Sequence, residues 1–220
     1  MKYKNILILG ATGATGRWLV QMATERGHQV TALVRSKENI EERDGLEIVQ
    51  GDVLDAATLE HVMEGKDAVL SCLGISRKSA SNPWSPLLSS SDFSATSAQS
   101  IVVAMKKHGV ERLIAISAAG VGDSKANVDP ITRLLFRKSN LSITLQDSEN
   151  MEEVYTDSGL DSLAVRPVRL VDGAPANRAR IVERCGISSK ISRSDVAGWM
   201  LDALERPEPF TSRSEMIAWK

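Results

Sequence analysis

Short apolar runs alternate along the chain with longer segments in which apolar residues recur at helical spacing. The short runs are typical of buried parallel strands, and the longer segments are typical of helices that bury one face. This pattern predicts strands at 4–9, 29–34, 46–50, 68–72, 112–117, 161–166 and 214–218, and helices at 15–26, 56–64, 93–108, 148–158 and 194–205. Because strands and helices alternate, we expect an α/β fold in which helices cover both faces of a doubly wound parallel sheet.

Three glycines, Gly10, Gly13 and Gly16, connect the first predicted strand to the first predicted helix. In such a turn the first glycine permits a tight bend, the second lets a phosphate approach the backbone, and the third lets helix and strand pack closely. The N–H groups at the start of the helix can then hold a pyrophosphate. A glycine triplet alone is a weak signal, but this one has the strand-to-helix context that a dinucleotide site requires. A glycine-rich turn without a ligand is the alternative.

The end of the second predicted strand indicates which dinucleotide fits. Arg35 stands at the place where an acidic residue would bind the ribose 2′-hydroxyl of NAD. An arginine, together with Ser36 and Lys37, can instead pair with the 2′-phosphate of NADP. We therefore expect NADP(H) to be favoured over NAD(H), and a solvated arginine at a strand end is the alternative.

The loop after the third predicted strand is expected to lie beside the adenine. Asp52 can accept a hydrogen bond from the adenine amino group, while Val53 packs on the ring. Asp52 is explained equally well as the N-cap of the following helix, because aspartate favours that position.

Two long segments interrupt the alternation of strands and helices, and both follow the carboxyl ends of strands, where ligands of such sheets bind. Residues 76–92, rich in Ser, Asn and Pro, are expected to cover the cofactor, and Trp84 within them is a candidate for substrate contact. Residues 167–192 are expected to be irregular and to wall the substrate pocket. A plain surface loop and a solvated connection are the respective alternatives.

Ser117 ends the fifth predicted strand and is the candidate catalytic residue. Its hydroxyl can hydrogen-bond either a carbonyl that is being reduced or the nicotinamide carboxamide. Carbonyl reductases of this architecture usually add a tyrosine and a lysine four residues later. The chain has only Tyr3 and Tyr155, and Tyr155 is followed at that spacing by Gly159. Tyr155 also lies on an apolar helix stripe, so we expect it to be a packing residue.

The missing tyrosine–lysine pair constrains the chemistry. Reduction of a carbonyl to an alcohol needs a proton donor at the developing alkoxide, whereas a hydride can pass to a flavin or another conjugated acceptor while solvent supplies the proton. Glu152 or Asp147 could serve as the acid if it were buried. Both are expected to be solvated, because carboxylates on amphipathic helices usually face water.

Composition narrows the range of functions. The chain has 220 residues, 42% hydrophobic residues and a formal net charge of −1, which fits one domain and gives no reason to expect a nucleic acid or a membrane as partner. No secretory signal or membrane-spanning run is present, and Cys72 and Cys185 have no metal-like spacing, so we expect a cytoplasmic protein with no metal site. We expect both cysteines to be packing residues. His28 and His108 lie in helix-to-strand turns and are expected to be solvated.

Seven motifs together resemble a known family. They are Gly10–Gly16, Thr31–Arg35, Gly51–Asp55, Lys66–Val69, Ser158–Asp161, Val165–Pro167 and Ile191–Ala197. In these motifs the chain is similar to the atypical short-chain dehydrogenase/reductases with one NAD(P)-binding Rossmann domain. Within that family it resembles flavin reductase, also called biliverdin IX-beta reductase, and the NmrA-like NAD(P)H-binding proteins.

The resemblance implies that nearly the whole chain, residues 1–220, forms one NAD(P)-binding domain. It also places Ser117 near the nicotinamide. The candidate cofactor-binding residues are Gly10, Thr12, Gly13, Ala14, Thr15, Gly16, Arg35, Asp52, Val53, Cys72, Leu73, Gly74, Ser117, Pro167 and Val168. The chain departs from flavin reductase, because Ser148, Glu152 and Val168 or Arg169 stand near the places of that enzyme's histidines.

The leading functional hypothesis is an NADPH-dependent oxidoreductase that reduces a conjugated small molecule such as a flavin or quinone-like acceptor. Ser117 would orient the nicotinamide or the acceptor, and Arg169 would pair with an anionic group of the substrate. A non-catalytic NADP(H) sensor is the competing hypothesis, and an epimerase or dehydratase is a third that needs a tyrosine base. We expect a monomer or homodimer whose partner is a small molecule.

Overall fold

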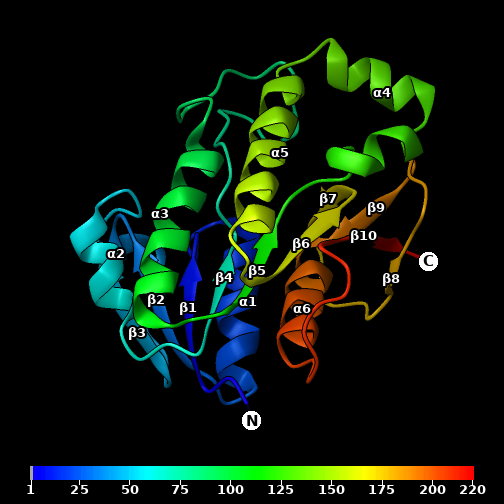
Figure 1. Ribbon diagram of the computed structural model, residues 1–220. Helices are drawn as coiled ribbons and strands as arrows, with labels where there is room; N and C mark the ends of the chain where they lie inside the picture. The colour runs from blue at the N-terminus through cyan, green and yellow to red at the C-terminus, as the bar shows by residue number, and fades with distance from the viewer. Residues whose placement is uncertain (1) are drawn as a thin grey trace.

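The apolar runs form one 8-stranded sheet in the computed structural model, which describes residues 2–220 (Figure 1). The strands, in the order in which they neighbour one another, are β3 (Leu46–Gln50), β2 (Gln29–Val34), β1 (Asn5–Leu9), β4 (Ala68–Ser71), β5 (Arg112–Ile116), β6 (Asp161–Pro167), β10 (Ser214–Trp219) and β8 (Ala179–Ile181). All neighbours are parallel except β10 and β8. The order reverses between β1 and β4, and ligands of doubly wound sheets bind at such a point, outside the carboxyl ends of the strands.

Helices cover both faces of the sheet, as predicted. Figure 1 shows α2 (Ala56–Met63), α3 (Phe93–His108) and α5 (Leu141–Asp157) in front of the sheet, with α1 (Ala14–Glu25) and α6 (Arg193–Leu204) behind it. Successive strand residues point to opposite faces, so Ile6 and Ile8 pack with α1 and α6, whereas Leu7 and Leu9 pack with α2, α3 and α5. The predicted α/β fold class is therefore confirmed. Within residues 2–220, no helix combines the length and hydropathy that a membrane span requires.

The region between β5 and α5 contains two elements that the sequence pattern did not predict. They are the 3-10 helix η2 (Gly122–Asn127) and the helix α4 (Pro130–Arg137), and α4 lies above the carboxyl edge of the sheet in Figure 1. Helix α4 starts where Asp129 accepts hydrogen bonds from the backbone N–H groups of Ile131 and Thr132. Helix α5 begins at Leu141, so its predicted start at residue 148 was wrong.

The expectation of an irregular segment at 167–192 was also wrong. This segment contains three short strands, β7 (Arg169–Val171), β8 and β9 (Lys190–Ser192), and β7 pairs with β9 in a separate two-stranded sheet. The carboxylate of Asp195, at the start of α6, accepts hydrogen bonds from the backbone N–H groups of Ala176 and Asn177 and so holds the loop between β7 and β8 in place.

Segment 76–92 is a loop, as predicted, and it is fastened to the turn between α4 and α5. The backbone N–H of Asn140 donates to the carbonyl of Pro83 at 3.1 Å, and its side chain donates to the carbonyls of Trp84 and Ser85. Loop 76–92 and the α4–α5 turn therefore form one connected structure.

Two residues expected to be solvated are buried. His28 is 1% exposed, and its ring Nδ1 lies 2.8 Å from the carbonyl of Tyr3, because the turn between α1 and β2 is packed under the N-terminal residues. Asp147 is also 1% exposed. Its carboxylate accepts from the backbone N–H groups of Ser94 and Ala95 at 2.8 and 3.0 Å, in the first turn of α3, which has no side-chain cap of its own.

We expect Asp147→Ala to lower the free energy of unfolding by about 1–3 kcal/mol, because two N–H groups at the start of α3 lose their acceptor. The measurement is urea denaturation. Asp92→Ala is the matched control, because Asp92 precedes α3 but makes no capping hydrogen bond with its side chain. A loss in the control as large as that in Asp147→Ala would contradict the capping role of Asp147.

Candidate functional site

The glycine turn between β1 and α1 is packed so closely that side chains cannot replace two of its glycines. Gly10 has φ +77°, and a Cβ there would lie 2.8 Å from the carbonyl carbon and oxygen of Cys72, which follows β4. A Cβ on Gly16 would lie 2.1 Å from the carbonyl oxygen of Gly10. The turn therefore presses against β4, and the first turn of α1 presses against the glycine turn.

The start of α1 offers backbone N–H groups without a competing acid. Gly13 is its N-cap, no side chain caps the helix, and its first turn has no acidic residue. The first N–H groups of a helix have no intrahelical acceptor and carry the positive end of the helix dipole. Gly13 and Ala14 are exposed, so these groups can be reached from solvent. The turn fits the pyrophosphate of a dinucleotide.

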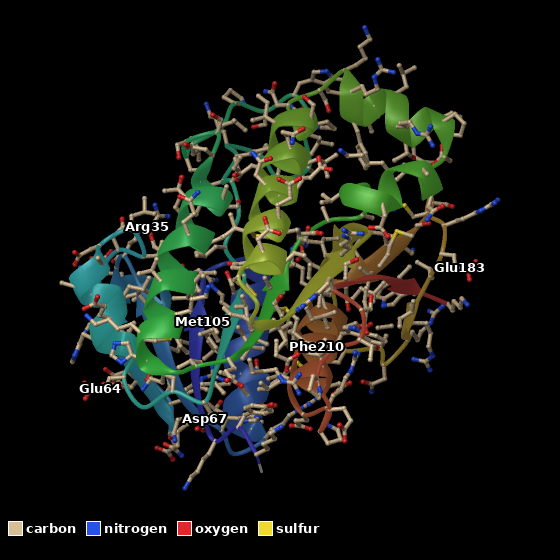
Figure 2. The ribbon with its side chains drawn as sticks, in the orientation of Figure 1. Arg35, Glu64, Asp67, Met105, Glu183 and Phe210 are labelled. Atoms are coloured by element: carbon tan, nitrogen blue, oxygen red, sulfur yellow. The ribbon has the colours of Figure 1, made fainter. Side chains whose placement is uncertain are left out.

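The other candidate cofactor residues follow neighbouring strands at the same edge of the sheet. Figure 2 shows Arg35 at the upper, carboxyl edge and Asp67 at the opposite edge. Arg35 is exposed, and among the residues that the structure describes no carboxylate forms an ion pair with it. The further candidates at this edge are Asp52 and Val53 after β3, and Cys72, Leu73 and Gly74 after β4.

The structure excludes one of the two explanations of Asp52, namely that it is the N-cap of the following helix. Helix α2 is capped by Asp55, whose carboxylate accepts from the backbone N–H of Thr58 at 3.2 Å. Asp52 is exposed and accepts from the N–H of Leu54 at 2.9 Å within its own loop. The N-cap explanation of Asp52 was therefore wrong, because the helix starts three residues further along.

The cysteines have the properties of packing residues. Burial raises the pKa of Cys72 to about 12, so its thiol stays protonated at neutral pH. Burial and the charge of Asp129 raise the pKa of Cys185. Neither cysteine is therefore an activated nucleophile.

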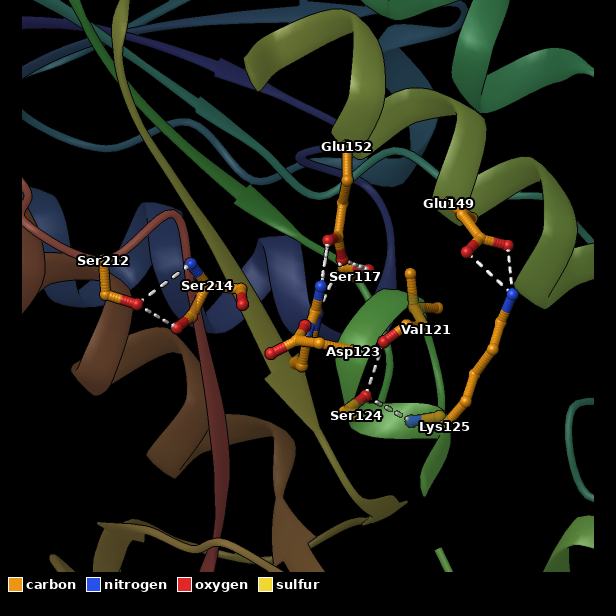
Figure 3. A network of polar contacts seen from close by, with 11 residues as sticks. Ser117, Val121, Asp123, Ser124, Lys125, Glu149, Glu152, Ser212 and Ser214 are labelled. Carbon is orange, nitrogen blue, oxygen red and sulfur yellow. Dashed lines mark hydrogen bonds and ion pairs between the residues drawn. The ribbon is translucent and has the colours of Figure 1, made fainter. Parts of the chain in front are cut away.

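A cluster of four polar side chains, Ser117, Asp123, Glu152 and Arg166, lies at the carboxyl ends of β5 and β6. Figure 3 shows Glu152 reaching from α5 toward Ser117 at the end of β5. The hydroxyl of Ser117 donates to Glu152 Oε1, and Arg166 Nε donates to both carboxylate oxygens of Glu152 at 3.0 and 3.2 Å. Arg166 also pairs with Asp123 through Nη1. We call these residues the Ser117 cluster.

At the buried centre of the Ser117 cluster, the negative charge of Glu152 balances the positive charge of Arg166. The side chains of Arg166 and Glu152 are 7% and 11% exposed, whereas that of Asp123 is 85% exposed. Burial alone would lower the pKa of Arg166, but the hydrogen bonds to Glu152 and Asp123 outweigh burial and raise it. The hydrogen bond from Arg166 lowers the pKa of Asp123. Arg166 also packs against Gly122, where a Cβ would lie 2.7 Å from Nη2.

Glu152 was expected to be solvated, and the structure corrects that expectation. The helix pattern showed only that Glu152 was polar. The overlooked signal was Arg166, a charged residue inside an apolar strand, since a buried arginine needs a carboxylate partner. Because side chains alternate along a strand, Arg166 points to the face of the sheet that α5 covers.

Tyr155 is a packing residue, as predicted. It is 4% exposed, and burial raises the pKa of its phenol, an effect that a hydrogen bond with Ser71 only partly offsets. Ser148 is also buried in α5. Within the described residues, no tyrosine–lysine pair faces Ser117.

The remaining candidates lie at the end of β6, on β7 and in loop 76–92. Pro167 ends β6 and its carbonyl accepts from the N–H of Ala119 at 3.0 Å, and Val168 is buried beside it. Arg169 is exposed on β7. Trp84 is 58% exposed, and its indole N–H donates to the carbonyl of Lys138 at 3.0 Å, at the α4–α5 turn.

Comparison with known proteins identifies relatives that match nearly the whole chain and relatives that match about half of it. The uncharacterised protein YwnB of Bacillus subtilis is 25% identical over 225 residues, covering 96% of this chain and 97% of YwnB. Divinyl chlorophyllide a 8-vinyl-reductase of Arabidopsis thaliana is 30% identical over 128 residues, covering 52% of this chain and 29% of that larger enzyme. The solved structure of ChuY, an anaerobillin reductase from Escherichia coli O157:H7, has a TM-score of 0.78 at 19% identity, covering 97% of this chain and 96% of ChuY.

The ChuY likeness shows the fold, since its sequence identity is low. The family follows from the sequence itself, because residues 10–207 match the family described as NAD(P)H-binding. This match includes the glycine turn, the strand ends at the carboxyl edge and the Ser117 cluster, and it confirms the resemblance derived from the sequence motifs. The chain therefore belongs to the NAD(P)H-binding family.

Proposed function

We propose that the protein is an NADP(H)-dependent reductase of a conjugated small molecule, such as a flavin or a quinone-like acceptor. The observation that carries this proposal is the carboxyl edge of the sheet. There the uncapped glycine turn of α1 and the Ser117 cluster lie on the two sides of the point where the strand order reverses.

Each part of that edge has a proposed task. The N–H groups of the glycine turn bind the pyrophosphate, Arg35 with Lys37 binds the 2′-phosphate, and Asp52 with Val53 binds the adenine. Pro167 and Val168 pack beside the nicotinamide ring. When bound, the reduced nicotinamide supplies a hydride.

The Ser117 cluster supports a conjugated acceptor rather than an isolated ketone. No tyrosine–lysine pair within residues 2–220 stands ready to protonate an alkoxide, and the hydroxyl of Ser117 already donates to Glu152. Two proteins similar to this chain are named as reductases of a vinyl group on a chlorophyllide and of anaerobillin. Both names are consistent with a reductase whose acceptor is conjugated.

The proposal is tested by titrating the protein with NADPH and NADH, and then following the absorbance of the reduced nicotinamide after addition of FMN or a simple quinone. NADPH binding with oxidation that depends on the acceptor is the expected result. NADPH binding without oxidation by either acceptor would count against the reductase and favour the cofactor sensor. A sensor should bind NADPH and NADP with clearly different affinities.

We expect Arg35→Glu to weaken NADPH binding by about 1–3 kcal/mol, roughly 5- to 150-fold, because a charge-assisted pair with the 2′-phosphate is lost. Binding of NADH, which lacks that phosphate, is expected to change much less. Arg184→Glu is the charge-matched control, since Arg184 is exposed just beyond β8, at the far end of the sheet from β2. An unchanged NADPH affinity in Arg35→Glu would remove the case for phosphate recognition.

A further inference from the structure

The direction of the hydrogen bond between Ser117 and Glu152 is fixed by the chemistry of the two groups. An ionised carboxylate can only accept hydrogen bonds, and a serine hydroxyl has one proton and two lone pairs. Arg166, which is cationic and can only donate, holds the carboxylate of Glu152 through Nε and Nη2. The proton of Ser117 is therefore committed to Glu152, and the lone pairs of its oxygen remain free.

The backbone around Ser117 adds few donors to this part of the edge. The N–H of Ser117 donates to the carbonyl of Val165 at 2.7 Å, that of Ala119 donates to Pro167, and that of Gly120 donates to Ser124 Oγ at 3.0 Å. Of the four backbone N–H groups of residues 117–120, three therefore donate hydrogen bonds to acceptors within the protein. A carbonyl oxygen or an oxyanion would find little to accept from here.

We propose that Glu152 is a positioning residue that makes Ser117 a hydrogen-bond acceptor, and that Ser117 accepts from the carboxamide N–H of the bound nicotinamide. This inference rests on the proposed binding of NADP(H). Ser117 is half-buried at the nicotinamide side of the reversal point, so its oxygen can be reached. The hydroxyl thus orients the ring and does not polarise the substrate, which assigns to Ser117 one of its two predicted roles.

The direction of this hydrogen bond can be tested with two cofactor analogues. The reduced 3-acetylpyridine analogue of NADPH has a methyl group in place of the carboxamide nitrogen, whereas the reduced thionicotinamide analogue keeps the N–H donors and changes the carbonyl. By calorimetry, we expect the protein to bind the acetylpyridine analogue about three- to tenfold more weakly than NADPH, the effect of one lost hydrogen bond. We expect the thionicotinamide analogue to bind within about twofold of NADPH.

Two variants connect this discrimination to the proposed residues. Ser117→Ala is expected to bind NADPH about three- to tenfold more weakly and to lose the discrimination against the acetylpyridine analogue. Glu152→Gln is expected to lose it as well, because a neutral amide can donate to Ser117 and release its proton. Binding of 2′-phospho-ADP-ribose, which lacks the nicotinamide, should be unchanged in both variants, and a merely structural defect would weaken it.

Glu149→Gln is the matched control, since Glu149 lies one turn earlier on α5 and pairs with Lys125 instead. It should retain the discrimination. The proposal is overturned if the unmodified protein binds NADPH and the acetylpyridine analogue equally well, or if Ser117→Ala weakens both to the same extent. Failure to bind NADPH at all would instead refute the proposed function.

Discussion

Gly16→Ala is expected to weaken NADPH binding by about 100-fold, equivalent to two charge-assisted hydrogen bonds. The added Cβ would lie 2.1 Å from the carbonyl oxygen of Gly10 and 2.9 Å from Cα of Ala11. Both are backbone atoms, so the contact is relieved only if α1 moves away from the turn. That movement withdraws the N–H groups of Ala14 and Thr15 from the pyrophosphate. Fluorescence titration with NADPH measures the effect.

The same variant is expected to lower the free energy of unfolding by about 3 kcal/mol, near the upper range for overpacking. Gly198→Ala, in α6, is the control, because a Cβ there would lie 3.5 Å from Cε of Met22, an ordinary contact. It should leave NADPH binding unchanged and raise helix stability by up to about 1 kcal/mol. Tight NADPH binding by Gly16→Ala would show that the glycine turn does not hold the cofactor.

The sheet was predictable because its signals are local. Each long strand is a short apolar run, and Leu7 and Ile8 of β1 show why: one packs under α3 and the other under α1, so the strand is apolar on both faces. The glycine turn was predictable for the same reason, since the strand, glycines and helix follow one another along the chain.

The elements above the carboxyl edge were harder to predict because contacts between distant segments stabilise them. Helix α4 has only eight residues, and of these only Thr132 is buried, whereas the apolar Ile131 and Leu134 stay exposed, so the helix adds little to the core. The sequence did contain a signal for the start of α4, because Asp129 followed by Pro130 is a combination typical of a helix N-terminus. β7 and β9 have three residues each and show no period of their own.

The buried carboxylates were wrongly predicted for a related reason. Asp147 accepts a hydrogen bond from Ser94, which lies 53 residues earlier in the first turn of α3, and Glu152 meets Ser117 across 35 residues. A helix pattern reports that such residues are polar, but their partners depend on how α5 packs against α3 and the sheet. Only Arg166, a charge within a buried strand, gave a sequence-level reason to expect a buried acid nearby.

Arg166→Met is expected to lower the free energy of unfolding by about 3–5 kcal/mol, because the carboxylate of Glu152 is left buried without its cation. Glu152→Met is expected to cost a similar amount, since Arg166 then keeps only the exposed Asp123 as a partner. Urea denaturation measures both. Lys125→Met is the control and should cost about 1 kcal/mol or less, because the side chain of Lys125 in its pair with Glu149 is 55% exposed.

The double variant Glu152→Met/Arg166→Met separates the structural role of the buried pair from its role at Ser117. Replacing both ions with apolar side chains of similar size removes the unpaired charge, so stability should return to within about 1–2 kcal/mol of the original protein. Ser117 then has no carboxylate to receive its proton, so discrimination against the acetylpyridine analogue should stay lost although the fold is restored. Additive losses in the double variant would contradict the pairing of Glu152 with Arg166. Restored stability with intact discrimination would instead show that Ser117 is oriented without Glu152.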